Sequence, residues 1–328
     1  MTFPRKQLLV TAAFASTAAL LAGCSGGGGG GPAPDPDEPI AITVGTLPAG
    51  DYAPLYIAED RGFFEEEGLD VTIEIIAGGA VGMTQLVSGD LDFSSATWGN
   101  VLSAVSQGLE IQVVREGTNS AKEGINGMIA LEGSGIDGPE DFRGQTISVN
   151  TLQSATELQI RDCLETEGLG PDDYELVEVP FPEVGAAVSQ GRIAAGFVPE
   201  PFITIGAAED LVPVMYPSVC NEDQANSPLI NWNISQEFGE GNSEVVAAFV
   251  RAMDRATQLA IEDPQVVVDI LPTFTTLTPE QAGQLVLPSF VEDGTPDLDG
   301  AQLTMDLMVK WGLIDEPIDD LSQYAWQG

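Results

Sequence analysis

The chain has 328 residues, enough for one large domain or two of ordinary size, and 43% of them are hydrophobic, so it can bury a sizeable core. It carries 51 acidic residues against 11 basic ones and no histidine, for a formal net charge of -40. An acidic surface repels nucleic acid and anionic lipid, and the missing histidine excludes a Ser-His-Asp triad, a Cys-His pair and an HExxH zinc site. Carboxylate chemistry remains open. The acidity fits either a secreted protein of low pI or a protein from a salty environment.

Residues 1–23 are predicted to be the signal peptide of a lipoprotein. Arg5 and Lys6 precede the apolar run Leu8–Leu21, which is shorter than the ~20 residues that a membrane-spanning helix needs. The sequence LAGC that ends at Cys24 resembles a bacterial lipobox, whose cysteine is lipidated after cleavage. The alternative is an ordinary secretory cleavage site with an incidental cysteine.

Residues 24–39 have the composition of a tether. Six glycines, Gly26–Gly31, give a flexible segment, and the prolines and acids of PAPDPDEP stiffen and charge its far end. A lipid on Cys24 would hold the protein at the outer face of the cell membrane. No later segment is long and apolar enough to span a bilayer.

From Ile40 onward, short strands alternate with helices. Strands are expected in the first part at 40–47, 69–76, 91–95 and 111–117, and in the second part at 127–131, 145–150, 174–180, 193–198 and 211–217. The last third is mainly helical, at 244–262, 264–271, 279–285 and 301–311. This alternation predicts an α/β fold with mainly parallel sheets flanked by helices.

One internal similarity suggests two related halves. The segments VSGDLDFSSATW and VSQGRIAAGFVPEPF each give a helix end, a glycine, a short strand and a polar loop. We interpret them as corresponding parts of two similar α/β lobes. A chance match between two common helix-to-strand turns is the alternative.

Four loops that follow predicted strands are rich in small polar residues, and each precedes a helix. Ligands of open α/β sheets bind at the carboxyl ends of strands, where helix N-termini offer free N–H groups. The four loops together therefore predict a polar cleft, formed by residues 49–52, 78–80, 94–98 and 150–156.

Several side chains in or near these loops could contact a ligand. Tyr52 and Trp98 could stack on a flat solute, or they could be ordinary core residues. Glu200 lies between two prolines and could accept hydrogen bonds from an amine or a ring N–H, or it could cap nearby backbone. Arg115 is the candidate cation if the ligand is an anion, and Asn119 lies at the same lip of the cleft.

The remaining chemistry-bearing residues indicate little. Cys163 and Cys220 could form a disulfide in an exported compartment, or they could be two separate buried thiols. The glycine run lacks the lysine of a phosphate-binding loop and follows no strand. No metal-ligand spacing appears, so we expect neither a metal nor a cofactor.

Three segments carry a family resemblance. YAPLYIAEDRGFFEEEGLDVTIE resembles the opening of the ABC-importer solute-binding proteins of the nitrate/sulfonate/taurine and thiamine-pyrimidine-precursor group. SVNTLQSATELQIRDCLETEGLGPDD and VEVPFPEVGAAVSQGRIAAGFVPEPF are similar to that group's second-lobe segments. The resemblance implies a two-lobed fold of the periplasmic-binding-protein type II kind, a solute in the interlobe cleft, docking of the closed protein on a membrane permease, and a monomer.

The resemblance also implies lobe boundaries and site residues. Lobe one would be 40–116 with 223–328, and lobe two 117–222. The ligand-binding residues that it implies are Tyr52, Gly79, Trp98, Asn119, Thr151, Ser154 and Glu200. The group includes a pyrimidine synthase that uses histidine as a reactant, and since this chain has no histidine we do not expect that activity.

The expected solute is small and organic. The proposed lining has aromatics and a carboxylate but few cations, which favours a neutral or amine-bearing heterocycle such as a pyrimidine. A sulfonate, taurine, nitrate or carboxylate anion, held by helix N-termini and Arg115, is the alternative. An exported carboxylate-dependent enzyme and a ligand sensor without a permease are the rival classes.

Overall fold

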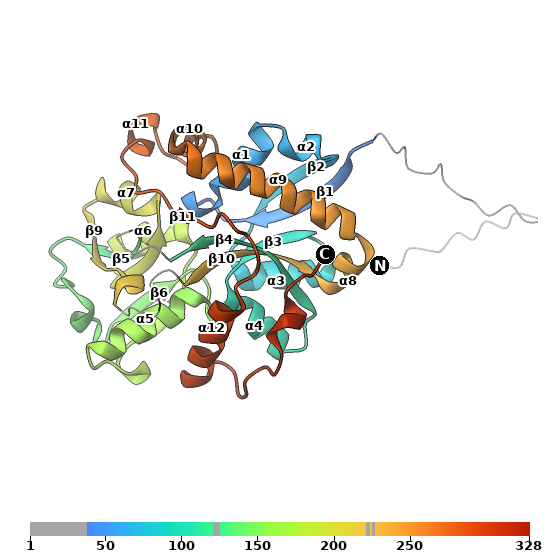
Figure 1. The fold of residues 1–328 in the computed structure, drawn as a ribbon. Coiled ribbons are helices and arrows are strands. Elements are labelled where there is room, and N and C mark those ends of the chain that lie inside the picture. The colour runs from blue at the N-terminus through green and yellow to red at the C-terminus, as the bar shows by residue number, and fades with distance from the viewer. Residues whose placement is uncertain (1–37, 121–124, 221–223, 225–226) are drawn as a thin grey trace, which may run out of the picture. The chain divides into compact units, whose positions relative to one another are not determined.

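The computed structural model describes residues 38–120, 125–220, 224 and 227–328. The predicted signal peptide and almost all of the tether, Cys24 included, lie outside the described residues. Residues Pro39–Gly328 form one unit, in which helices flank two separate sheets (Figure 1).

The larger sheet has six strands in the order β11-β4-β10-β3-β1-β2. Its strands are β1 Ile40–Thr46, β2 Leu69–Ile75, β3 Phe93–Ala96, β4 Ile111–Asn119, β10 Pro228–Ser235 and β11 Ser289–Phe290. Strand β1 runs parallel to β2 and β3, whereas β10 runs antiparallel to β3 and β4, and β11 antiparallel to β4. We call this sheet and its helices the first lobe.

The smaller sheet has five strands in the order β7-β6-β8-β5-β9. They are β5 Asn126–Leu131, β6 Thr146–Val149, β7 Glu175–Glu178, β8 Ala195–Pro199 and β9 Leu211–Met215. Their pairing repeats that of β2-β1-β3-β10-β4: three parallel strands, then one antiparallel to both of its neighbours. The two similar segments of the sequence contain β3 and β8, which are corresponding strands, so two related lobes are confirmed. We call this half the second lobe.

The expected α/β fold is confirmed: most strands of each sheet point the same way, and β10 and the short β11 in the first lobe and β5 in the second run against them. The chain leaves the first lobe after Asn119 and returns through β10, which runs against its neighbours. Strand β10 was not predicted. It is buried along almost its whole length. Its segment INWNIS alternates apolar and polar residues, which is typical of a strand, but Asn231 and Asn233, both buried here, are of a residue type that is depleted in strands and common in loops.

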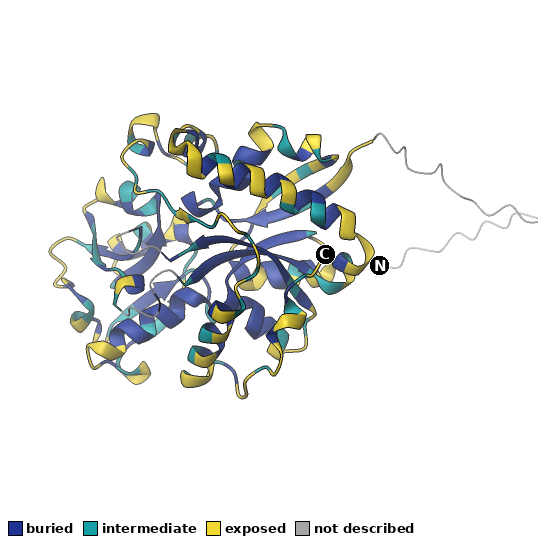
Figure 2. Cartoon of the chain, viewed as in Figure 1, coloured by how far each residue is buried: buried dark blue, intermediate teal, exposed yellow. Residues whose placement is uncertain are grey.

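Helices cover both sheets, and Figure 2 shows them buried on the side that faces a sheet and exposed on the other. They are α1 Ala53–Asp60, α2 Phe63–Glu66, α3 Gly79–Ser88, α4 Trp98–Ser106, α5 Ala155–Thr166, α6 Phe181–Ser189, α7 Phe202–Ala207, α8 Gln236–Gly241, α9 Ser243–Glu262, α10 Pro264–Phe274, α11 Pro279–Ala282 and α12 Leu298–Lys310. None of the helices in the described part of the chain is long and apolar enough to cross a membrane.

The core of the first lobe centres on stacked aromatic rings. Helix α9 is the longest, and its buried face packs on α1 and α2. Its Phe249 stacks on Phe93 of β3 with ring centroids 4.0 Å apart, and on Phe64 of α2 at 5.6 Å. Burying three such rings anchors α9 to the sheet, because aromatic side chains supply a large share of core stabilisation.

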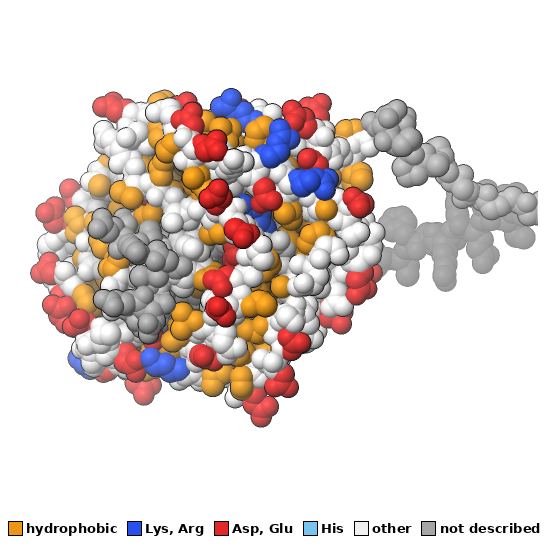
Figure 3. All heavy atoms as spheres, viewed as in Figure 1, with side chains coloured by type: hydrophobic (Ala, Val, Ile, Leu, Met, Phe, Trp, Pro, Cys, Tyr) orange, Lys and Arg blue, Asp and Glu red, His pale blue; other side chains and the backbone are white. Residues whose placement is uncertain are grey.

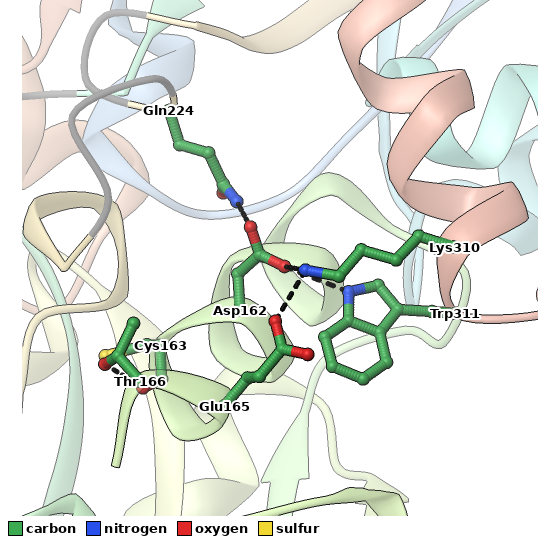
Figure 4. A network of polar contacts seen from close by, with 7 residues as sticks. All are labelled: Asp162, Cys163, Glu165, Thr166, Gln224, Lys310 and Trp311. Carbon is green, nitrogen blue, oxygen red and sulfur yellow. Dashed lines mark hydrogen bonds and ion pairs between the residues drawn. The ribbon is translucent and has the colours of Figure 1, made fainter. Parts of the chain in front are cut away.

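A disulfide and an ionic cluster fix the outer side of α5. Cys163 of α5 and Cys220, which follows β9, form a disulfide with Cα atoms 5.2 Å apart. In the cluster, Asp162 accepts hydrogen bonds from Lys310 Nζ at 2.8 Å, Trp311 Nε1 at 3.1 Å and Gln224 Nε2 at 2.6 Å (Figure 4). Helix α12 packs against both α4 and α5, so these contacts attach the second lobe to the first.

The first prediction concerns this cluster. Lys310 also contacts Glu165 at 2.6 Å, and its side chain is 42% exposed. Lys310 is exposed but its partner Asp162 is only 4% exposed, so Lys310→Met leaves a buried carboxylate with fewer partners and should lower the free energy of unfolding by about 2 kcal/mol, more than an exposed pair would. Urea denaturation measures it, and molar salt should shrink the difference from the wild-type chain. Arg251→Met, which removes an exposed ion pair with Glu67, is the control inside the first lobe. A loss for Lys310→Met that salt leaves unchanged would contradict the ionic account.

Candidate functional site

A cavity lies where the two lobes meet. Its free volume is only about 30 Å³, room for about one or two water molecules, so the lobes are closed on each other in this structure. All four of the predicted polar loops contribute to it, so the predicted position of the cleft is confirmed. Its lining residues are Leu47, Ala49, Asp51, Tyr52, Gly79, Ala96, Thr97, Asn100, Asn126, Asn150, Thr151, Thr156, Phe181, Phe197, Pro199, Leu229 and Ile230.

The loops converge here because parallel strands end at one edge of each sheet. Strands β1 and β3 of the first lobe lead into α1 and α4, and β6 of the second lobe leads into α5. Polar residues cap two of these helices: Thr97 accepts from the backbone N–H of Asn100, and Ser154 from that of Glu157. Caps fix where a helix begins, and therefore where the preceding loop faces the cavity.

Asp51 is the one charged residue among the described residues that line the cavity. It is 7% exposed, and one carboxylate oxygen accepts a hydrogen bond from Thr118 Oγ1 at 3.3 Å. Burial raises the pKa of Asp51 from 3.8 to about 6, against the lowering effect of hydrogen bonds from its own backbone and Thr118. At neutral pH the cavity therefore contains one buried carboxylate.

Two asparagines differ in how far their hydrogen bonds are satisfied. Asn100 Nδ2 donates to the carbonyl oxygens of Leu152 and Gln153, each at 3.4 Å, so it links the lobes. Asn126, the first residue of β5, has a buried Oδ1 with no hydrogen-bond partner. Buried acceptors are rarely left unpaired, so an unpaired one in a cavity wall points to a ligand donor.

Aromatic side chains form the apolar walls. Tyr52 of the first lobe and Phe181 and Phe197 of the second line the cavity. The two phenylalanine rings are 6.3 Å apart, and Tyr52 meets the ring of Trp232 edge-on at 6.2 Å. Burial raises the pKa of the Tyr52 hydroxyl far above its ordinary value, so it stays protonated.

Three of the eight predicted ligand-binding residues line the cavity: Tyr52, Gly79 and Thr151. The other five are not in its lining: Trp98, Arg115, Asn119, Ser154 and Glu200. For each of the five, the structure shows contacts within the fold.

Trp98 is a core residue, which corrects the expectation that it stacks on the solute. Its side chain is fully buried, and its Nε1 donates to Glu116 Oε1 at 2.8 Å. The same oxygen accepts from the backbone N–H of Asp297 at 3.0 Å. The indole therefore joins α4, β4 and the start of α12, because the first turn of α4 directs it into the core.

Arg115 does not reach the cavity, which corrects its expected role as the cation for an anionic ligand. Its side chain is fully buried, and its Nε contacts Asp254 of α9 at 2.7 Å. Its Nη2 donates to the carbonyl oxygen of Val291 at 3.3 Å. A buried guanidinium requires an acidic partner, which Asp254 on α9 supplies.

Glu200, Ser154 and Asn119 also have structural partners. The carboxylate of Glu200 accepts from the N–H and the hydroxyl of Thr204, both at 3.1 Å. Ser154 is the cap of α5, and Asn119 pairs in the sheet with Pro228 and Ser289. The Glu200 carbonyl accepts from Gly50 N–H at 3.0 Å, so the backbone of this residue links the second lobe to the first.

Sequence reasoning did not single out Asp51, Asn126, Phe181 or Phe197. Asp51 lies inside one of the predicted loops, between Gly50 and Tyr52, and this position alone could have identified it as a candidate. The other three belong to the second lobe and reach the cavity only when the lobes come together. Among the described residues, no cluster of three or more Cys, Asp or Glu side chains could hold a metal ion.

The second prediction concerns the buried carboxylate of Glu116. Burial raises its pKa from 4.5 to about 7, so between these values the folded state binds more protons than the unfolded state. The free energy of unfolding should therefore fall as the pH rises through this window. Glu116→Gln keeps the oxygen that accepts from Trp98 and removes the titratable proton. Urea denaturation at a series of pH values should therefore show a shallower dependence of the free energy of unfolding on pH than in the wild-type chain.

The control for this prediction is Glu262→Gln at the exposed end of α9, which should keep the wild-type slope. This control is needed because a chain of charge -40 gains stability on protonation at many sites. Equal slopes for the wild-type chain and Glu116→Gln would contradict the buried-carboxylate account.

The chain is similar to both enzymes and binding proteins. It is 24% identical over 239 residues to the 4-amino-5-hydroxymethyl-2-methylpyrimidine phosphate synthase THI13 of Saccharomyces cerevisiae, covering 69% of this chain and 68% of that protein. It is 26% identical over 278 residues to the taurine-binding periplasmic protein of Escherichia coli, covering 81% and 80%.

Solved structures show the same fold. The alkanesulfonate-binding protein SsuA of Xanthomonas axonopodis pv. citri, bound to MOPS, superposes with a TM-score of 0.75 at 16% identity, over 89% of this chain and 99% of that one. The fold is thus the two-lobed fold of periplasmic binding proteins. The sequence profile described as NMT1/THI5 like matches residues 49–266. Since this match covers more than half of the chain, the protein belongs to the NMT1/THI5-like family.

Proposed function

We propose that this protein is the extracytoplasmic solute-binding component of an ABC importer. It captures a small organic solute between its lobes and delivers it to a membrane permease, without catalysing a reaction. The observation that carries the proposal is the cavity lined from both lobes, with aromatic walls, asparagines and a single carboxylate. A residue set of this kind recognises a molecule by stacking and hydrogen bonds.

The proposed solute is a flat heterocycle with amine or ring N–H groups, such as a pyrimidine. Tyr52, Phe181 and Phe197 offer apolar faces, and no lysine or arginine occurs among the described lining residues. The relatives named for taurine and alkanesulfonate make an anion the alternative. The burial of Arg115 against Asp254 removes the cation that this alternative invoked.

The parts of the chain have proposed roles in this function. Residues 1–23 would direct export, and 24–39 would tether the protein through a lipid on Cys24. The two lobes would move against each other. The expected boundary at 116/117 lies inside β4, so lobe one would extend to Asn119 and resume with β10, and lobe two would be the five-stranded sheet with its helices. The surface is acidic, and Figure 3 shows Asp and Glu spread over one face with few basic side chains between them.

Binding would require the lobes to close, and their contact is unusually close at the start of α4. Ala155 N–H donates to Thr97 Oγ1 at 3.1 Å. A Cβ on Gly99 would lie 2.7 Å from the carbonyl oxygen of Gln153 and 2.9 Å from the carbonyl carbon of Ser154. Because the obstacle is backbone, a side chain at position 99 is incompatible with this closed arrangement.

The third prediction tests binding and closure together. Thermal shift of the wild-type chain against pyrimidines, flavins, aromatic acids, taurine, alkyl sulfonates and nitrate should give at least one strong hit. Calorimetry with that hit should show Gly99→Ala binding about tenfold or more weakly, since its closed state is blocked. Alanine stabilises a helix by ~1 kcal/mol relative to glycine, so the free energy of unfolding of Gly99→Ala should not fall together with its affinity for the solute.

Gly241→Ala at the end of α8 is the matched control, because a Cβ there meets nothing within 4 Å. It should bind the hit as tightly as the wild-type chain. No hit in the panel, or conversion of a hit to a product, would contradict the proposed function. Unchanged affinity in Gly99→Ala would contradict closure at α4.

The fourth prediction tests the anchor. If Cys24 carries the lipid, Cys24→Ala should release the protein from the cell membrane into the soluble extracytoplasmic fraction. Fractionation followed by immunoblotting measures the distribution. Cys163→Ala, which changes a cysteine inside the folded part, is the control. If this variant folds, it should remain attached to the membrane. Retention of Cys24→Ala on membranes would overturn the anchor.

A further inference from the structure

We propose that the solute carries a positively charged group with N–H donors, and that Asp51 and Asn126 bind this group from the two lobes. This inference rests on the proposed function and specifies the chemical class of its solute. Asp51 lies in the turn after β1 of the first lobe, and Asn126 begins β5 of the second. Both line the same cavity.

The first argument is charge. Asp51 is 7% exposed, and Thr118, its side-chain hydrogen-bond partner, is a neutral donor. No cation contributes to the pKa of Asp51, whose shift comes from burial and these hydrogen bonds. Arg115 is held by Asp254 and does not line the cavity. A cation on the solute therefore gains a buried partner that the protein does not supply, whereas an anion would face a carboxylate.

The second argument is the unpaired acceptor. Asn126 Oδ1 is buried and has no partner, although Asn100 in the same lining uses its amide to link the lobes. A carbonyl oxygen in this position needs a donor. A solute N–H supplies one, and a sulfonate or nitrate oxygen does not.

The third argument is the aromatic lining. Tyr52, Phe181 and Phe197 line the cavity together with Asp51. Aromatic faces attract cations through their quadrupoles, most strongly where water is excluded. The combination fits an amidinium, a primary ammonium or a protonated aminoheterocycle. A quaternary ammonium would satisfy the aromatics and Asp51 but leave Asn126 unpaired.

Two sets of equally shaped probes test the charge preference on the full chain. The first is benzamidine, benzamide and benzoate, and the smaller one is acetamidine, acetamide and acetate. Calorimetry at roughly pH 8 keeps Asp51 ionised, since its pKa is about 6. In at least one set the amidine should bind about tenfold or more tightly than the amide, and the carboxylate should bind most weakly.

Three variants distinguish the effect of the cavity residues on binding from the effect of the protein's net charge. Asp51→Asn should lower amidine affinity about tenfold or more and leave amide affinity within about threefold. Asn126→Ala should weaken both the amidine and the amide, since both donate N–H groups. Asp60→Asn, an exposed acid at the end of α1 with the same change in charge, is the matched control and should keep wild-type selectivity.

The outcomes decide between this inference and the broader function. Tighter binding of a carboxylate than of its amidine, failure of both amidines to bind, or equal losses in Asp51→Asn and Asp60→Asn would each overturn the cationic class. None of these would affect the proposed function, whose own test is a hit in the wider panel and the loss of its affinity in Gly99→Ala.

Discussion

The site depends on one contact between the lobes. In this contact the first turn of α4 packs against the backbone of residues 152–155. At this point the lobes approach so closely that only glycine fits at position 99. The flanking polar groups use the same contact: Thr97 accepts from Ala155 N–H, and Asn100 donates to two carbonyl oxygens. The cavity lies directly beside this contact, with Thr97 and Asn100 in its wall. Its shape is therefore determined by how the lobes meet.

Buried ionisable groups occur in two settings with different consequences. Arg115 and Glu116 are neighbours on β4, and both have partners inside the first lobe: Asp254 for Arg115, and Trp98 for one oxygen of Glu116, whose other oxygen has no hydrogen-bond partner. Such groups stabilise the fold only while their partners remain, because an unpaired buried charge is very unfavourable. Asp51 differs because its side-chain partner is neutral and it faces the cavity. Burial alone therefore does not decide the role of an ionisable side chain. A side chain held by partners in the core is structural, and one that faces the cavity without a charged partner is available to a solute.

The scarcity of basic residues shapes both surface and site. With 11 basic residues against 51 acidic ones, most described cations are engaged in ion pairs, such as Lys310 with Asp162 and Arg255 with Glu66. The cluster around Asp162 uses one of these cations to hold α12 against α5 (Figure 4). Cations placed at lobe contacts and within the core leave the cavity without one. This distribution favours solutes that bring their own positive charge.

The sequence by itself determined the α/β class, most strands and helices, and the four loops that line the cavity, because strand alternation, helix ends and glycine stops are local patterns. Only the tertiary structure decided which side chains of those loops face the cavity. Trp98 and Arg115 turn into the core, whereas Asn126 and Phe197 arrive from the second lobe. Strand β10 was missed for a different reason: its segment INWNIS does alternate, but its two asparagines are of a residue type that is depleted in strands. Side-chain direction at such positions depends on sheet pairing and on the approach of the lobes, which join residues far apart in the chain.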